Sequence, residues 1–221
     1  MQASELFNQP NTILLDGGMG TMLQAAGMKL GTRPEDLNLE NPELIRSIHA
    51  KYAAAGSRVV NANTFGASPH KLADSKYTLE EVITAGIANC KQAVAPYGAL
   101  VTLDVGPLGE LLEPSGTLAF EDAVAEYGRI VRAGVAAGAD ILYFETFTDL
   151  YEMKAALLAA KENSTLPIMA SMSFEANGRT FTGCTVESFA ATARGLGANA
   201  VGINCSLGPK EIFPMAKRLA E

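Results

Sequence analysis

Residues 138–153 have the sequence GADILYFETFTDLYEM, and this stretch contains the unit that decides the fold. Gly138 ends one helix, residues 141–144 form a continuous apolar run, and Asp149 with Glu152 has the spacing of a capping box that begins the next helix. An apolar strand placed between two helices is typical of a parallel strand buried on both faces. The stretch therefore predicts one β–α unit of a parallel sheet.

The same unit occurs six times along the chain. The predicted strands are residues 12–15, 58–62, 100–103, 141–144, 168–171 and 200–203. The helices between them have their own start signals, which are Asn41 before Pro42, Thr78 with Glu81, Thr185, and Pro209. Strands that alternate with helices predict a parallel sheet with right-handed crossovers. No low-complexity linker divides the chain, so we expect one α/β domain over residues 1–221.

Two architectures fit this alternation, an open doubly wound sheet and a closed (β/α)8 barrel of the TIM type. Six units in 221 residues give about 37 residues per unit. Eight such units would need roughly 295 residues, which lies in the usual range of barrels. A barrel would therefore have only about six of its eight units in this sequence.

The composition excludes several classes of protein. The formal net charge is −7, from 17 Lys and Arg against 24 Asp and Glu, which does not favour a nucleic-acid or anionic-membrane partner. No apolar run reaches the ~18 residues of a membrane-spanning helix. The N-terminus lacks the pattern of a signal peptide, and the three cysteines form no CxxC pair. We therefore expect a cytoplasmic protein.

Polar residues follow every predicted strand at its carboxyl end. They are Asp16-Gly17-Gly18, Asn61 with Asn63, Asp104, Glu145, Ser171 with Ser173, and Asn204-Cys205-Ser206. The carboxyl ends of parallel strands meet at one edge of the sheet, where α/β proteins place their sites. Six such positions in register predict one shared site.

Each of these residues also has a structural explanation. Asp16 and Asp104 could simply shape turns before glycines, and Asn63 is more often a hydrogen-bond strut than a ligand contact. The run from Gly17 to Gly20 is not a GxGxxG motif and has no P-loop lysine, so we expect its backbone N–H groups to meet a small carboxylate. Glu145 follows an apolar run directly, and a buried carboxylate needs a cationic partner such as a ligand ammonium group.

Cys205 is the most informative cysteine because it lies at a strand end beside Asn204. It could be a nucleophile or a ligand of a soft metal. Cys-His catalysis is weakly supported, because the only histidines are His49, within a predicted helix, and His70. No lysine follows a strand, which counts against an aldolase-like, phosphate-binding barrel.

Five stretches together resemble the homocysteine S-methyltransferase family. They are ILLDGGMGTMLQ (13–24), PEDLNLENPELIRSIHAKYAAAGSRVVNANTFGAS (34–68), LVTLDVGPLGELLEP (100–114), ILYFETFTDLYEM (141–153) and AVGINCSLGP (200–209). The second stretch looks closest to the N-terminal homocysteine-binding module of cobalamin-dependent methionine synthases. Members of the family are (β/α)8 barrels, so the resemblance favours the barrel, here C-terminally incomplete.

The resemblance also implies a reaction and a site. The family moves a methyl group onto the sulfur of homocysteine, giving methionine, and a zinc ion held by three cysteine thiolates activates that sulfur. Cys205 matches the first zinc ligand, whereas the Cys-Cys pair that supplies the others is absent from this sequence. Asp16 with Gly17, and Glu145, match the positions that hold the amino-acid end of homocysteine, and we expect Gly18 and Asn63 beside them. No protein group is expected to act as a general acid or base.

Two functional hypotheses follow. The first is the methyl-accepting module of a methyltransferase, with methylcobalamin as the methyl donor and further domains of a larger protein as partners; betaine, S-methylmethionine and S-adenosylmethionine remain alternative donors. The second is a truncated, non-catalytic fragment that binds an amino acid or a partner, as the missing cysteines favour. Zinc stoichiometry separates the two hypotheses. Because Cys205 is one of the three thiolates that the family uses, we expect weak zinc binding by this chain alone, and we also expect self-association through open sheet edges.

Overall fold

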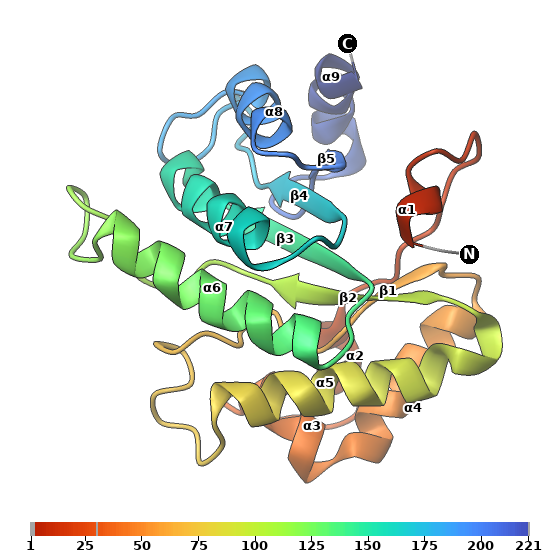
Figure 1. The fold of residues 1–221 in the computed structure, drawn as a ribbon. Coiled ribbons are helices and arrows are strands. Elements are labelled where there is room, and N and C mark those ends of the chain that lie inside the picture. Colours follow the sequence, from red (N-terminus) through yellow and green to blue (C-terminus); the bar gives the residue numbers. More distant parts are fainter. Residues whose placement is uncertain (1–2, 30, 221) are drawn as a thin grey trace.

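The computed structural model describes residues 3–29 and 31–220 and shows one parallel sheet in the strand order β1-β2-β3-β4-β5. The strands are β1 (Val59–Asn61), β2 (Leu100–Val105), β3 (Ile141–Phe147), β4 (Ile168–Met172) and β5 (Ala200–Ile203). Each strand pairs with its successor in the sequence, so the strand order does not reverse. A doubly wound sheet, in contrast, has a point at which the strand order reverses. The sheet is part of a barrel wall, which confirms the predicted TIM-barrel type (Figure 1).

The longer helices cover the outer face of this wall (Figure 1). They are α4 (Pro42–Ala54), α5 (Leu79–Val94), α6 (Phe120–Ala136), α7 (Leu150–Asn163), α8 (Val186–Gly195) and α9 (Pro209–Ala220). Shorter helices are α1 (Ala3–Leu6), α2 (Met19–Ala25), α3 (Leu37–Glu40), η1 (Pro34–Asp36) and η2 (Ala95–Tyr97). In the part of the chain that the structure describes, no helix is long and apolar enough to cross a membrane.

The prediction of a strand at residues 12–15 is wrong. Leu15 makes one isolated parallel bridge to Val59, and the Leu14 carbonyl accepts a hydrogen bond from the Arg58 N–H at 2.8 Å. These residues therefore lie beside β1. Because β1 is only three residues long, residues 12–15 form one bridge with it and not a strand. The sheet is open, as predicted, with five strands rather than six.

The inner face of the sheet changes from apolar to polar along the strands. At the amino ends, Val59, Leu100, Ile141 and Met169 pack with Leu6 of α1 in one cluster, so α1 covers that end. Alternate residues such as Val60, Val101, Leu142 and Ala170 point outward into the main core beneath the helices. Further along, the inward positions are polar, with Thr102 donating a hydrogen bond to Asn61 Oδ1 at 2.8 Å. The polar end of the lumen is therefore the place for a site.

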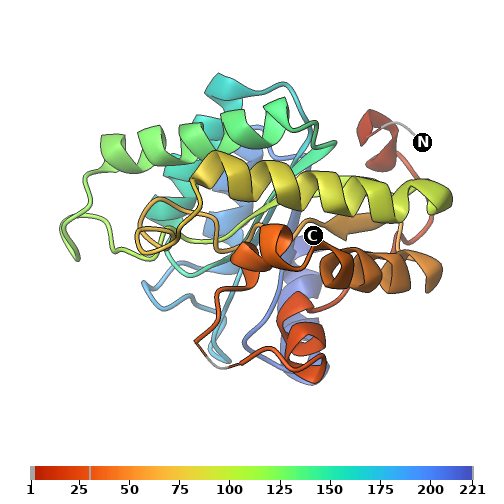
Figure 2. The ribbon, with the colours of Figure 1, turned by 90° about the horizontal axis from the view of Figure 1, so that it is seen from below.

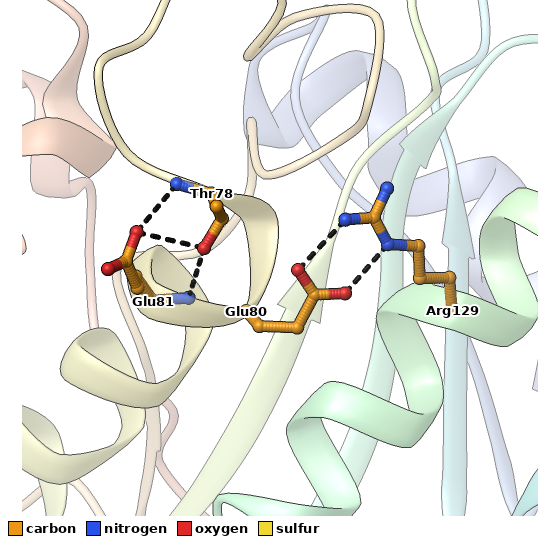
Figure 3. Close-up of polar contacts among 4 residues, drawn as sticks. All are labelled: Thr78, Glu80, Glu81 and Arg129. Carbon is orange, nitrogen blue, oxygen red and sulfur yellow. Dashed lines mark hydrogen bonds and ion pairs between the residues drawn. The ribbon is translucent and has the colours of Figure 1, made fainter.

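The predicted helix starts are mostly confirmed. Thr78 and Glu81 form a capping box at the start of α5 (Figure 3). Asn41 and Thr185 cap α4 and α8. Next to the box, Glu80 pairs with Arg129 through two hydrogen bonds of 2.7 and 2.8 Å, which join α5 to α6, and these helices lie side by side in Figure 2.

The capping box predicted at α7 is wrong in one half. Asp149 does cap the helix, because its Oδ1 accepts from the Tyr151 N–H at 2.9 Å. Glu152, however, is buried, and its Oε1 accepts hydrogen bonds from the Leu108 N–H at 2.8 Å and the Tyr127 hydroxyl at 2.9 Å. Its partners come from α6 and from the loop after β2, so local spacing could not reveal them.

Candidate functional site: an acidic cluster at the carboxyl ends of the strands

Three carboxylates gather at the polar end of the lumen. Asp16 follows the Leu15 bridge and is held by its Oδ2, which accepts a hydrogen bond from the Asn61 N–H at 3.0 Å. Asp104 lies on β2 and Glu145 on β3, at inward positions of neighbouring strands. We call these three residues the acidic cluster.

Burial raises the pKa of each carboxyl group of the acidic cluster. Burial, reinforced by the charge of Glu145, raises the pKa of Asp16 to about 7 even though the Asn61 N–H acts in the opposite direction. Burial also raises the pKa of Glu145, against a hydrogen bond from Tyr143 that lowers it. Both shifts disfavour the ionised form of these side chains, which a nearby positive charge would favour.

Asp104 also belongs to the acidic cluster, although the sequence analysis gave it only the role of shaping a turn. It is 7% exposed, and its Oδ1 has no hydrogen-bond partner. Burial, followed by the charges of Glu145 and Asp16, raises its pKa well above the ordinary value. The alternation along β2 could have identified it, because Val101, Leu103 and Val105 face the outer core and leave Thr102 and Asp104 facing inward.

Gly17 and Gly18 form a loop beside Asp16 that Tyr52 of α4 holds in place. A Cβ at Gly17 would lie 2.9 Å from the Tyr52 ring, so a larger residue does not fit there. The Tyr52 hydroxyl donates a hydrogen bond to the Gly18 carbonyl at 3.2 Å. Sequence reasoning missed Tyr52, since its contact with the loop joins positions 34 residues apart.

Asn63 braces the protein beside the cluster. Its Nδ2 donates to the Pro34 carbonyl at 2.7 Å and to Asn38 Oδ1 at 2.9 Å, and the residue is 5% exposed. It therefore ties η1 and α3 to the segment after β1. A contact between Asn63 and a substrate stays a prediction.

Asn204 connects the acidic cluster to Cys205. Its Nδ2 lies 3.3 Å from Glu145 Oε2, 2.8 Å from Thr146 Oγ1 and 3.5 Å from Cys205 Sγ. Its Oδ1 accepts from the Thr146 N–H at 3.1 Å and from Ser171 Oγ at 2.9 Å. Thr146 and Cys205 have positive φ angles of 63° and 58°, which are strained for residues with a side chain. The Asn204 side-chain amide contacts both residues.

Cys205 is the candidate metal ligand among the predicted site residues. Its side chain is exposed, whereas Cys90 is buried. Among the residues that the structure describes, no three His, Cys, Asp or Glu side chains are grouped so that they could hold a metal ion. One thiolate does not fit the three or four ligands of a zinc site, so these residues do not form one by themselves.

Two grooves lie away from the acidic cluster. One, of about 550 Å³, lies between α8, β5 and α9 and is lined by Ala190, Ala191, Val201 and Leu219 among others. The second, of about 420 Å³, lies at the starts of α7 and α8. Neither contains a residue of the acidic cluster.

Comparison with known proteins points to one family. The family model described as homocysteine S-methyltransferase matches residues 13–221. The curated methionine synthase of Mycobacterium tuberculosis is 28% identical over 223 residues, which cover 93% of this chain and 19% of that protein. The chain therefore spans about a fifth of the length of this relative.

Solved structures show the same fold. The metallated form of the homocysteine methyltransferase MmuM from Escherichia coli superposes with a TM-score of 0.85 at 22% identity, covering 99% of this chain and 83% of that one. Its apo form gives a TM-score of 0.76 at 24% identity and covers 97% of this chain and 79% of that one.

Proposed function

Because the family model spans residues 13–221, the chain belongs to the homocysteine S-methyltransferase family, and we propose that its acidic cluster binds homocysteine as the methyl acceptor. Membership of the family makes it a methyltransferase of the homocysteine methyltransferase and methionine synthase type. The product of the proposed reaction is methionine.

The observation that carries the proposal is the burial of three carboxyl groups at the polar end of the lumen. The ionisable groups that perturb Asp104 are Glu145, Asp16, Glu35 and Cys205, and none of these supplies a positive charge. Buried carboxylates are costly unless a cation meets them, and the ammonium group of an amino acid is such a cation. Asp16 and Glu145 are the residues we expect to bind it.

The carboxylate of the same amino acid needs hydrogen-bond donors. The backbone N–H groups of the loop at Gly17 and Gly18 are suited to this role, because a glycine backbone allows close approach and Tyr52 fixes the loop. With both ends of the amino acid held, its side chain would extend toward Cys205, which the Asn204 amide links to Glu145.

The sulfur of homocysteine needs activation, since a thiol with a pKa near ~8.5 is mostly protonated at neutral pH. Within the proposal, Cys205 is one ligand of a zinc ion whose other thiolates come from outside the described residues. A bound zinc ion would hold the substrate sulfur as a thiolate. The proposed donor is methylcobalamin, presented by other domains of a cytoplasmic methionine synthase, because the curated relative is a methionine synthase of about five times this chain's length.

A second candidate is a non-catalytic fragment that binds an amino acid without methyl transfer. It is supported because the described residues contain no group of three His, Cys, Asp or Glu side chains that could hold a metal ion. Zinc content separates the two candidates: metal analysis after dialysis should give well below one zinc per chain for the fragment. Stoichiometric zinc that is lost in Cys205→Ser would support the methyltransferase.

Calorimetric titration of the purified protein with homocysteine tests the main proposal. Removing one charged acceptor of an ammonium costs about ten-fold in affinity, so we expect Asp16→Asn and Glu145→Gln each to weaken binding by at least that factor without changing zinc content. Asp140→Asn is the matched control, because Asp140 lies at the opposite ends of the strands, where it accepts from the Val101 N–H. Unchanged binding in both variants, or an equal loss of homocysteine and zinc, would contradict the proposal.

A further inference from the structure

The structure assigns Tyr143 a positioning role: its hydroxyl holds the Glu145 side chain in place from the apolar part of the lumen. This inference rests on the proposed function, because Glu145 is one of the residues we expect to bind homocysteine. Tyr143 lies on β3 two residues before Glu145, so both side chains point into the lumen. The sequence analysis counted Tyr143 only as part of an apolar run.

The ring and the hydroxyl of Tyr143 lie in different surroundings. The ring packs with Ile141 and Met169 in the apolar cluster that α1 covers, and the residue is 7% exposed. The hydroxyl lies 3.0 Å from Ser171 Oγ on β4 and donates a hydrogen bond to Glu145. The side chain is therefore fixed at both ends, because its ring is packed and its hydroxyl is bonded. Tyr143 marks the boundary between the apolar and the polar parts of the lumen.

Glu145 is held from a second side by Asn204. Asn204 Nδ2 donates to Glu145 Oε2 at 3.3 Å, and Asn204 Oδ1 accepts from Ser171 Oγ at 2.9 Å. Together with the contact between Tyr143 and Ser171, these bonds close a ring of four side chains. The four residues come from β3, β4 and the end of β5, so neighbouring strands fix the carboxylate.

The Tyr143 hydroxyl has one proton and two acceptors within reach, Ser171 Oγ and the Glu145 carboxylate. Hydrogen bonds to a charged acceptor are the stronger ones, so Tyr143 donates to Glu145 whenever that group is ionised. Burial raises the pKa of Glu145, and the bond from Tyr143 opposes this effect. Asp16 and Asp104 also interact electrostatically with Glu145, but as carboxylates they oppose its ionisation. Tyr143 thus favours the ionised form of Glu145, which is the form that an ammonium group needs.

The test is calorimetric titration of the purified protein with homocysteine at pH ~6 and at pH ~8. Tyr143→Phe keeps the ring in the apolar cluster and removes only the hydroxyl. We expect it to weaken homocysteine binding about ten-fold at pH ~6, where Glu145 would bind a proton more readily, and about three-fold at pH ~8. A role in packing alone would give the same factor at both pH values.

Two further variants isolate the bond to Glu145. Ser171→Ala removes the neighbouring hydroxyl but leaves Tyr143 free to donate to Glu145, so any loss of affinity should be equal at the two pH values. Thr102→Val is the matched control, because it removes another buried lumen hydroxyl, one that is bonded to Asn61, and it should leave binding within about two-fold. Tyr143→Met also fills the apolar cluster without a hydroxyl, and it replaces the phenylalanine variant if thermal melting shows that the latter does not fold.

The outcomes separate the two proposals. A loss that is larger at pH ~6 than at pH ~8, and that is absent from Thr102→Val, supports the role of Tyr143. If Tyr143→Phe binds homocysteine as tightly as the unmodified protein, or loses the same factor at both pH values, the positioning role is refuted while the proposed function stands. If the unmodified protein binds no homocysteine, the proposed function fails, and the role of Tyr143 with it.

Discussion

Burial of the Asp16 carboxylate makes the folded chain less stable at neutral pH. Its pKa is raised from 3.8 to about 7 by burial, so the folded state holds the proton more tightly than the unfolded chain. This contribution to stability is fully present below the unfolded pKa and is lost as the pH rises through the folded pKa. We expect Asp16→Asn to be more stable than the unmodified protein by about 4 kcal/mol at pH ~8, with the difference vanishing near pH ~4. Urea denaturation across this range measures it.

Asp74→Asn serves as the control, because Asp74 is exposed and its substitution should leave the stability unchanged at every pH. A stability difference for Asp16→Asn that stays constant from pH ~4 to ~8 would refute the explanation, since burial of the charge acts only on the ionised form.

The sequence identified some members of the site and missed others for a clear reason. Asp16 and Glu145 are visible because each follows an apolar run. Asp104 belongs to the same cluster, but this depends on which face of β2 its side chain occupies. The structure shows that face, because the neighbouring residues on β2 pack outward into the helical core. The several contacts of Asn204 join positions 33 and 58 residues away, and no local pattern encodes them.

Helix α7 is attached to its neighbours through Glu152, and this attachment should be costly to remove. Glu152→Ala leaves the Leu108 N–H and the Tyr127 hydroxyl buried without a partner, so we expect a loss of about 3 kcal/mol in the free energy of unfolding. Tyr127→Phe removes one of the two donors and should cost about 1 kcal/mol. Chemical denaturation of both variants measures these losses, and a Glu152→Ala variant within ~0.5 kcal/mol of the unmodified protein would contradict the assignment.

Local and distant interactions explain which elements were predictable. The caps at Asn41, Thr78 and Thr185 form within one helical turn, and all three are confirmed. Residues 12–15 have the composition of a strand, but strand formation needs a partner, and only Leu15 makes a bridge. The helix caps were therefore readable from local sequence, whereas the composition of residues 12–15 does not show how many pairing contacts they make.

The molecule as a whole has open edges that should promote self-association. Among the described residues, β5 pairs only with β4, and Leu14 beside β1 is 57% exposed. Phe213 on α9 is 70% exposed. Unprotected edges and exposed apolar groups favour association, so we expect the 221-residue chain to form dimers or larger species at micromolar concentration.

Size-exclusion chromatography with light scattering tests this expectation. Leu14→Lys combined with Phe213→Lys should shift the chain toward monomer, because charges on an edge oppose pairing. Glu121→Lys, which changes an exposed position at the start of α6, is the control and should leave the association unchanged. A monomeric unmodified chain with a sharp melting transition would contradict the prediction.

The strand order β1-β2-β3-β4-β5 also has a kinetic consequence. Because each strand pairs with its immediate successor, no pairing waits for a segment that is synthesised much later. Pairings between near neighbours lower the contact order, and folding is faster than in sheets whose strand order reverses. The sheet can therefore grow from β1 toward β5 while the chain leaves the ribosome, with each new helix covering the strand that precedes it.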